Sequence, residues 1–326
     1  MNLKTLTLVF IIFLCTVTAG IAAALLFGGP KQTAPMPSIN EAFKVLDYPD
    51  LAAIKRFTAR DGTRLGYREY PSARSSIKGS IVLIHGSSAN SISMHTLAKS
   101  FAQNDYLTYT LDIRGHGVSG IKGQIAYIGQ LEDDLADFMQ SVQFIGSKTL
   151  IGFSVGGGFA LRFASGPRQK MFDHYLLLSP FIHQDAPTTR PNNGKWVTVG
   201  VPRIIALTLL NLFGMTAFNH LPVTAFALDT QAQTLLTAQY SYTLSQNFRP
   251  RYDYRGDIRA LTQPLEILVG QNDETLYAEQ FAGIFNPEGK TINVTLIENT
   301  GHVEITLSPQ AIQASIAAVE RLNAQH

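Results

Sequence analysis

Leu150-Ile151-Gly152-Phe153-Ser154-Val155-Gly156-Gly157 is the stretch of this sequence that decides its fold. Residues 148–153 are typical of a buried strand, and residues 157–164 are typical of a helix. Ser154 therefore lies in a sharp turn from a strand into a helix. The flanking glycines suit this turn, because its central residue has a strained backbone and the strand and helix approach too closely for larger side chains.

A Gly-x-Ser-x-Gly pattern in this context is typical of a nucleophile elbow, in which the serine hydroxyl is presented at the end of a strand. A serine hydroxyl is a weak nucleophile at neutral pH, so it needs a base within hydrogen-bond reach, and that base must itself be oriented. In this architecture the chain order is serine, then acid, then histidine. We therefore expect the partners of Ser154 to lie further along the chain, in that order.

Asp273 and His302 have the expected order and setting. Asp273 follows a predicted strand at 265–269, and His302 follows another at 291–297. Because the carboxyl ends of parallel strands meet at one sheet edge, both side chains can converge on Ser154. The sequence predicts Ser154 as nucleophile, Asp273 as acid and His302 as base.

Other acids remain open alternatives. Glu274 and Asp257 are weaker candidates for the acid, and Asp273 also suits an ordinary turn or helix cap.

Two backbone N–H groups are predicted to stabilise an oxyanion. In this architecture one belongs to the residue after the nucleophile, here Val155, and the other comes from the loop after an early strand. That loop is His85-Gly86-Ser87-Ser88, from which we choose Ser87, with Ser88 as the alternative. His85 and, further on, His116 are interpreted as supports for their loops.

Strands and helices alternate along the rest of the chain. The pattern predicts an antiparallel pair at 54–59 and 65–70, and buried strands at 80–85, 106–112, 149–153, 175–179, 265–269 and 291–297. Helices are predicted at 91–103, 130–145, 157–165, 275–285 and 309–323. This alternation predicts an α/β fold with a mainly parallel, doubly wound sheet and helices on both faces.

The alternation breaks down between about 181 and 260, where we expect a helical lid insertion. Residues 199–213 are apolar around most of a helix circumference, and residues 218–228 are similarly apolar. Such a segment either packs over an apolar group of a substrate or is an ordinary core helix, and the sequence leaves both interpretations open.

The amino terminus is a separate region. Residues 5–27 carry no charge and can cross a hydrocarbon core of ~30 Å. Lys4 precedes them, which favours an inside amino terminus and a catalytic domain outside the cytoplasm. We favour an uncleaved anchor at 1–27; a cleaved signal peptide, giving a secreted or periplasmic protein, and a buried helix remain open. Residues 28–50 are predicted to be a linker, and residues 51–326 the main domain.

Composition narrows the range of partners. The chain has 326 residues, 26 basic and 24 acidic, and a net charge of +2. No run of charge favours nucleic acid, and the single cysteine, Cys15, lies in the apolar segment. No metal-ligand spacing occurs either, so we expect no metal, no cofactor and no nucleic acid partner. The oligomeric state is left open.

Three motifs together resemble the α/β-hydrolase superfamily over about residues 54–323. They are the His85-Gly86-Ser87 loop, the segment Asp112-Ile113-Arg114-Gly115-His116-Gly117-Val118-Ser119 and the elbow around Ser154. The resemblance is to the branch of monoacylglycerol lipases and lysophospholipases, of serine aminopeptidase S33 type. It implies the same assignment: Ser154, Asp273 and His302, with Ser87 and Val155 at the oxyanion. The amino-terminal segment and the 181–260 insertion depart from a typical member.

The expected activity is hydrolysis of carboxylic esters through an acyl-enzyme. The expected binding partner is a small-molecule ester, and one hypothesis is that this ester is derived from a lipid. Two other classes stay open. The same nucleophile could serve a peptidase or an acyltransferase, because an acyl-enzyme also reacts with amines and alcohols. A non-catalytic binding protein on this fold is the other alternative, although the presence of all three residues in order disfavours it.

Overall fold

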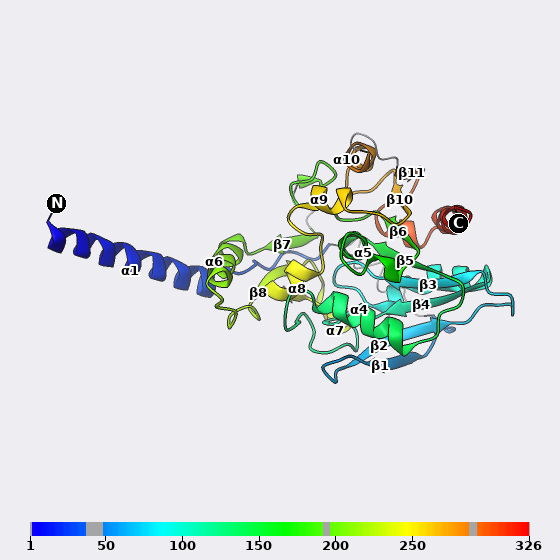
Figure 1. Ribbon diagram of the computed structural model, residues 1–326, viewed down its shortest axis with the longest axis horizontal. Coiled ribbons are helices and arrows are strands. Elements are labelled where there is room, and N and C mark those ends of the chain that lie inside the picture. The colour runs from blue at the N-terminus through cyan, green and yellow to red at the C-terminus, as the bar shows by residue number, and fades with distance from the viewer. Residues whose placement is uncertain (1, 37–47, 192–195, 287–291, 326) are drawn as a thin grey trace.

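The computed structural model describes residues 2–36, 48–191, 196–286 and 292–325. An eight-stranded sheet forms its centre, in the order β1-β2-β4-β3-β5-β6-β10-β11 (Figure 1). The strands are β1 Ile54–Thr58, β2 Arg64–Tyr70, β3 Gly79–Ile84, β4 Tyr106–Leu111, β5 Ser147–Phe153, β6 His174–Leu178, β10 Leu265–Gly270 and β11 Asn293–Ile297. β1 and β2 form an antiparallel pair and β2 runs antiparallel to β4, whereas all other neighbours are parallel. The predicted mainly parallel sheet is confirmed.

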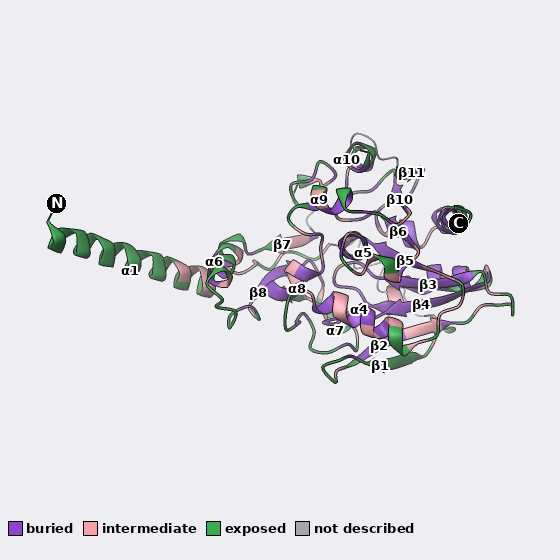
Figure 2. Ribbon diagram, viewed as in Figure 1, coloured by how far each residue is buried: buried purple, intermediate pink, exposed green. Residues whose placement is uncertain are grey.

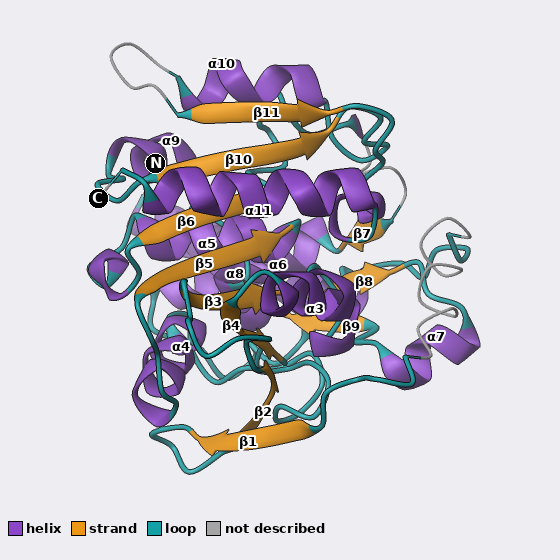
Figure 3. Ribbon diagram, turned by 90° about the vertical axis from the view of Figure 1, so that its right-hand side faces the viewer, coloured by secondary structure: helices purple, strands orange, loops and turns teal. Residues whose placement is uncertain are grey.

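Helices cover both faces of this sheet. β3 is buried on both sides: Ile81 and Leu83 point into one apolar cluster, and Val82 and Ile84 point into the other. The first cluster includes residues of α3 and α11, which lie in front of the sheet in Figure 3, and the second includes residues of α4, α5 and α10. These helices are α3 His95–Gln103, α4 Gln130–Ser141, α5 Val155–Ala164, α10 Phe281–Phe285 and α11 Pro309–Asn323. Continuous apolar strands are what a sheet buried on both faces requires.

Short 3₁₀ turns extend several of these elements: η1 Ser91–Met94, η2 Gln169–Met171, η4 Ala278–Gln280 and η5 Val303–Thr306. The predicted helix at 275–285 is therefore shorter than expected, because Asp273 and the residues after it form a turn at the site instead.

The predicted insertion is not purely helical. It contains a three-stranded sheet, β7-β8-β9, together with three helices: β7 Val197–Val199, α6 Val201–Leu212, β8 Pro222–Phe226, α7 Thr230–Leu235, β9 Gln239–Ser241 and α8 Tyr242–Asn247. The apolar run at 218–228 forms a strand because β7 and β9 pair with it on both sides. We call residues 179–253 the insertion. Near the predicted end of the insertion, Ile258 of α9 (Tyr254–Arg259) is buried in the same apolar cluster as Phe159 of α5 and Phe248.

The amino-terminal helix α1 (Leu3–Phe27) projects from the body of the molecule and is exposed along most of its length (Figure 2). It is long and apolar enough to cross a membrane by length and composition.

The first part of the segment predicted as a linker at 28–50 contacts the insertion. Residues 28–36 lie against the insertion, where Met36 N–H donates to Ala227 O at 2.9 Å and Thr198 Oγ1 donates to Lys31 O at 2.5 Å. Residues 37–47 lie outside the described part of the chain. Beyond them, Tyr48 contacts the ring of His95 on α3.

Candidate active site

Ser154 occupies the predicted elbow between β5 and α5. Its backbone has φ 54° and ψ −121°, a strained conformation for a residue with a side chain. A Cβ added at Gly152 would lie 2.2 Å from Gly156 O, and one at Gly156 would lie 2.3 Å from His85 O. Both flanking positions therefore exclude any larger residue, as the sequence predicted.

His302 and Asp273 meet Ser154 at this edge of the sheet. Ser154 Oγ lies 2.9 Å from His302 Nε2, and His302 Nδ1 lies 2.7 Å from Asp273 Oδ2. Asp273 follows β10 and His302 follows β11, two parallel neighbours. All three side chains are buried. The structure thus brings together three residues that are 148 and 29 positions apart in the chain.

Charge and hydrogen bonds shift the pKa values of Asp273 and His302 in opposite directions. Burial would raise the pKa of Asp273, but the charge of His302 and hydrogen bonds from His302 and Thr275 outweigh it and hold this pKa below its ordinary value. Burial would lower the pKa of His302, but the Asp273 carboxylate, by charge and hydrogen bond, and the charge of Glu274 raise it above the ordinary 6.5. An ionised Asp273 accepts the Nδ1 proton, which leaves His302 Nε2 free to accept the hydroxyl proton of Ser154.

Thr275 was not predicted from the sequence. Asp273 Oδ1 accepts hydrogen bonds from Thr275 N–H, Thr275 Oγ1 and Leu276 N–H at 2.8–2.9 Å. Thr275 Oγ1 also lies 3.0 Å from His302 Nδ1. Asp273 therefore forms a local turn with one oxygen and contacts His302 with the other, an arrangement that is compatible with both the capping and the acid interpretation. The Asp-x-Thr spacing, typical of such a turn, was the available signal.

The two alternative acids lie in other positions. Glu274 Oε2 accepts the backbone N–H of His302 at 2.9 Å, so it holds the histidine loop rather than the ring. Asp257 lies on α9 and pairs with Arg251. Neither carboxylate contacts the His302 imidazole.

The loop after β3 lies directly beside Ser154. A Cβ added at Gly86 would lie 3.3 Å from Ser154 Cβ, which is tighter than an ordinary contact, so glycine favours this close approach. His85 Nε2 accepts from Ile113 N–H at 3.3 Å, which leaves Nδ1 to donate to Gly86 O at 2.8 Å. Burial lowers the pKa of His85, consistent with this neutral tautomer. His85 therefore supports the loop, in line with its predicted role.

The two candidate oxyanion donors in this loop, Ser87 and Ser88, differ in whether the backbone N–H already donates a hydrogen bond. Ser88 N–H donates to Tyr240 Oη at 2.5 Å, so it is already used. In the described ranges, neither Ser87 N–H nor Val155 N–H has a protein acceptor. Both are partly exposed. Ser87 and Val155 therefore remain the candidate donors, and Ser88 does not.

The insertion is bonded to this loop through side chains that the sequence did not reveal. Trp196 Nε1 donates to Ser87 Oγ at 2.9 Å, and Ser88 Oγ donates to Thr237 O at 2.8 Å. Tyr240 Oη lies 2.6 Å from His116 Nε2. Burial lowers the pKa of His116 and raises that of Tyr240, so the neutral phenol donates to the neutral imidazole.

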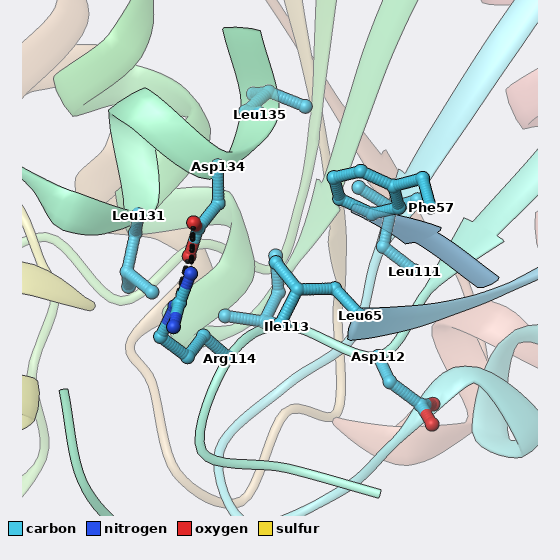
Figure 4. A pocket seen from close by; sticks show the side chains of 9 residues that line it. All are labelled: Phe57, Leu65, Leu111, Asp112, Ile113, Arg114, Leu131, Asp134 and Leu135. Carbon is cyan, nitrogen blue, oxygen red and sulfur yellow. Dashed lines mark hydrogen bonds and ion pairs between the residues drawn. The ribbon is translucent and has the colours of Figure 1, made fainter. Parts of the chain in front are cut away.

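The Asp112–Ser119 segment is structural. Asp112 accepts Val118 N–H at 2.9 Å within the segment and Ser91 N–H of η1 at 2.8 Å, which joins the segment to η1. Arg114 pairs with Asp134 at 2.7 Å and with Asp61 at 2.9 Å. A small pocket beside Arg114 and Asp134 is lined mainly by apolar side chains (Figure 4). No residue of the Ser154 site lines it.

In the described part of the chain, no group of three or more His, Cys, Asp or Glu residues is arranged to hold a metal ion.

The sheet order and the serine elbow define this molecule as an α/β-hydrolase. The family model described as serine aminopeptidase, S33 matches residues 75–294. The chain belongs to that family.

Comparison with individual proteins shows similarity to lipases. The chain is 33% identical over 97 residues to the monoacylglycerol lipase of Mycolicibacterium smegmatis, covering 28% of this chain and 33% of the relative. It is 25% identical over 171 residues to the monoglyceride lipase of Saccharomyces cerevisiae, covering 48% of this chain and 55% of the relative. The chain thus matches at most about half the length of these curated relatives.

Solved structures share the fold. The crystal structure of a soluble variant of the Saccharomyces cerevisiae monoglyceride lipase, in complex with a substrate analog, superposes with a TM-score of 0.63 at 18% identity, covering 86% of this chain and 98% of the other. A membrane phospholipase A described as a bacterial virulence factor gives a TM-score of 0.57 at 18% identity, covering 98% and 99%.

Proposed function

We propose that this protein is a serine hydrolase that cleaves carboxylic esters through an acyl-enzyme. The observation that carries the proposal is the contact of Ser154 Oγ with His302 Nε2 at 2.9 Å, together with the contact of His302 Nδ1 with Asp273 at 2.7 Å. A hydroxyl, a base and an orienting carboxylate in this arrangement provide an activated nucleophile.

In the proposed mechanism His302 removes the Ser154 proton as the oxygen attacks the ester carbonyl. Asp273 holds the imidazole in the required tautomer and stabilises its charged form. The backbone N–H groups of Val155 and Ser87 donate to the oxyanion. His302 then protonates the leaving alcohol and activates the water that releases the acid.

Lipid-derived esters are the proposed substrate class. Two of the curated relatives are named monoacylglycerol or monoglyceride lipase. The insertion, in the role of a lid, lies over the Ser87–Ser88 loop and carries long apolar segments. A chain-length series of p-nitrophenyl esters and monoacylglycerols tests this: rates should rise with acyl length, and equal rates would contradict it.

A peptidase is the second candidate, because the family description is serine aminopeptidase. Aminopeptidase and ester substrates compared on the same preparation separate the two. Faster release of aminoacyl products than of fatty acids would favour the peptidase.

The amino-terminal helix is proposed to be a retained membrane anchor, with the hydrolase domain outside the cytoplasm. Its support is the length and apolar character of α1 and the contact of Arg203 with the carbonyls of Leu25 and Leu26. A signal peptide cut after Ala24 would leave a new positive amine beside this arginine. Mass spectrometry of the protein from the membrane fraction should show an intact amino terminus, and a chain starting near Leu25 would contradict the proposal.

Ser154→Ala tests the catalytic proposal. Loss of the nucleophile should abolish ester hydrolysis and fluorophosphonate labelling, while Ser76→Ala, in an exposed loop, should change neither. Wild-type hydrolysis by folded Ser154→Ala would overturn the mechanism.

A further inference from the structure

Helix α6 of the insertion has two apolar faces. Its inner face, Arg203, Ala206, Leu207 and Leu210, is buried. Its outer face, at the same helical spacing, exposes Val201, Ile205, Leu209 and Leu212, and the chain continues into Phe213. Leu212 is 75% and Phe213 79% exposed. We call these five exposed residues the outer face of α6. An apolar stripe of this kind in water marks a surface that is covered by something else.

After Arg203, the chain that forms and follows the outer face of α6 contains no acidic residue, lysine or arginine. The sequence contains no Asp, Glu, Lys or Arg between Arg203 and Asp229. The turn after α6 also exposes Met215 and Phe218. A surface helix of a soluble domain ordinarily places charged side chains on such a face.

The carboxyl end of α1 lies against α6 (Figure 1). Leu25 of α1 and Ile204 of α6 pack on the same small apolar cluster, which contains Leu207 and Val223. A Cβ added at Gly200, which directly precedes α6, would lie 2.6 Å from Gly28 O, so the two chain segments approach as closely as backbone allows. α1 and α6 therefore form one tight junction.

The Arg203 side chain stabilises the contact between α1 and α6 by hydrogen bonds. Its guanidinium donates to Leu25 O at 2.9 Å, to Leu26 O at 3.2 Å and to Pro222 O at 2.7 Å. The last carbonyls of a helix lack intrahelical donors and carry partial negative charge, so a buried arginine suits them. Since Pro222 begins β8, one side chain ties the end of α1 to two elements of the insertion.

In the proposed anchoring, the length of α1 determines where this junction lies relative to the membrane. A helix of 25 residues is about 37 Å long, whereas the hydrocarbon core is ~30 Å thick. Its carboxyl end therefore emerges near the lipid headgroups, and α6 is joined to that end.

We propose that the outer face of α6 docks into the surface of the lipid bilayer that α1 crosses. This rests on the proposed anchoring role of α1, and it extends the proposal to the orientation of the active site. The occupant is lipid, because the outer face is continuous with α1 and is uncharged. The insertion lies between α1 and the central sheet (Figure 1). It also contacts the Ser87–Ser88 loop, so docking would hold this side of the site toward the bilayer.

Site-directed fluorescence in vesicles tests the docking. The full-length chain is reconstituted in phosphatidylcholine vesicles with or without brominated acyl chains. An environment-sensitive dye is attached at Cys15, the sole cysteine, or, in a Cys15→Ala background, at Leu212→Cys or Leu296→Cys. Leu296 is an exposed apolar residue on the edge strand β11, which gives a matched control.

Brominated lipid should quench the dyes at positions 15 and 212 and leave the dye at 296 unchanged. Quenching at 15 without quenching at 212 would overturn the docking and leave the anchor intact. No quenching at either position would overturn both. A dye at 212 that is shielded from aqueous iodide but not quenched by brominated lipid would show a protein partner, including a second copy, and would also overturn the proposal.

A kinetic test uses the same face. Leu212→Lys with Phe213→Lys should lower hydrolysis of a vesicle-embedded monoacylglycerol by about ten-fold or more, because each apolar side chain loses its burial in lipid. The rate with soluble p-nitrophenyl butyrate should stay unchanged, and Leu296→Lys should change neither rate. Equal losses on both substrates, or no loss on vesicles, would contradict the docking.

Discussion

The edge of the sheet that carries Ser154 and the insertion beside it are positioned by different kinds of contact. Ser154, Asp273 and His302 each follow a parallel strand of the central sheet, so their convergence is a consequence of the sheet itself. The insertion has a small sheet of its own, and single side chains such as Trp196 and Tyr240 bond it to the site. In the proposed function, the edge performs the chemistry and the insertion holds the Ser87–Ser88 loop beside it.

The largest expected effect lies at the catalytic edge. Asp273→Asn should lower kcat by about 10⁴-fold, because an amide no longer favours the tautomer with the proton on Nδ1 of His302. Glu274→Gln is the matched control: its amide oxygen can still accept His302 N–H, so kcat should fall by less than about ten-fold. Steady-state kinetics on folded variants measure both, and similar losses would show that the two acids were assigned wrongly.

The insertion should contribute a smaller but measurable effect through Tyr240. Tyr240→Phe leaves the buried Ser88 N–H and His116 Nε2 without partners, which should cost about 1–3 kcal/mol of unfolding free energy. It should also lower kcat more than it changes KM, since the Ser87 donor sits in the same loop. Tyr242→Phe, which loses only a contact with Thr208, is the control. An unchanged kcat for folded Tyr240→Phe would show that the two regions work independently.

The pH profile of kcat/KM tests the raised pKa of His302 at the edge of the sheet. Activity requires neutral His302, whose pKa is raised above 6.5 chiefly by the Asp273 carboxylate working against burial. Activity should therefore fall as pH drops through a midpoint above 6.5 and reach a plateau on the alkaline side. The same shift should stabilise the fold at acidic pH, below the ordinary His value, and this contribution is lost as pH rises through the raised pKa. A midpoint below 6.5 would contradict the charge balance described for the pair.

The smallest expected effect concerns Trp196. Trp196→Phe keeps the ring contact with Phe226 but removes the hydrogen bond to Ser87 Oγ. Because the catalytic donor is the backbone N–H of Ser87, kcat should fall by only about two- to five-fold, the scale of one neutral hydrogen bond. A stopped-flow or steady-state ester assay measures this. A loss as large as that of Asp273→Asn would mean that the insertion supplies part of the chemistry.

The catalytic edge could be predicted from sequence because local rules govern it. A glycine on each side of Ser154, an apolar strand before each functional residue and the order serine, acid, histidine are all visible in one chain. The helix at 309–323 was also predicted to the residue, since its apolar spacing has clear limits at Ser308 and Asn323. The Asp-x-Thr spacing signals the turn at Thr275, but the contact of Thr275 with His302, 27 positions away, has no mark in the sequence.

The insertion could not be predicted to the same extent. The apolar run at 218–228 fits a helix or a strand, and only pairing with β7 and β9 decides for a strand. The bonds from Tyr240 to Ser88 and His116 join residues more than 100 positions apart, and no spacing in the sequence marks them. The contact of α1 with Arg203 also joins distant residues, since Arg203 and Leu25 are 178 positions apart.

The central claim is that His302 activates the Ser154 hydroxyl as the nucleophile of an acyl-enzyme. Peptide mass spectrometry after reaction with a fluorophosphonate tests it most directly. The account predicts one adduct, on the peptide that contains Ser154, formed rapidly in the wild type and far more slowly in His302→Ala. An adduct on another serine, or labelling of Ser154 at an unchanged rate in folded His302→Ala, would contradict it.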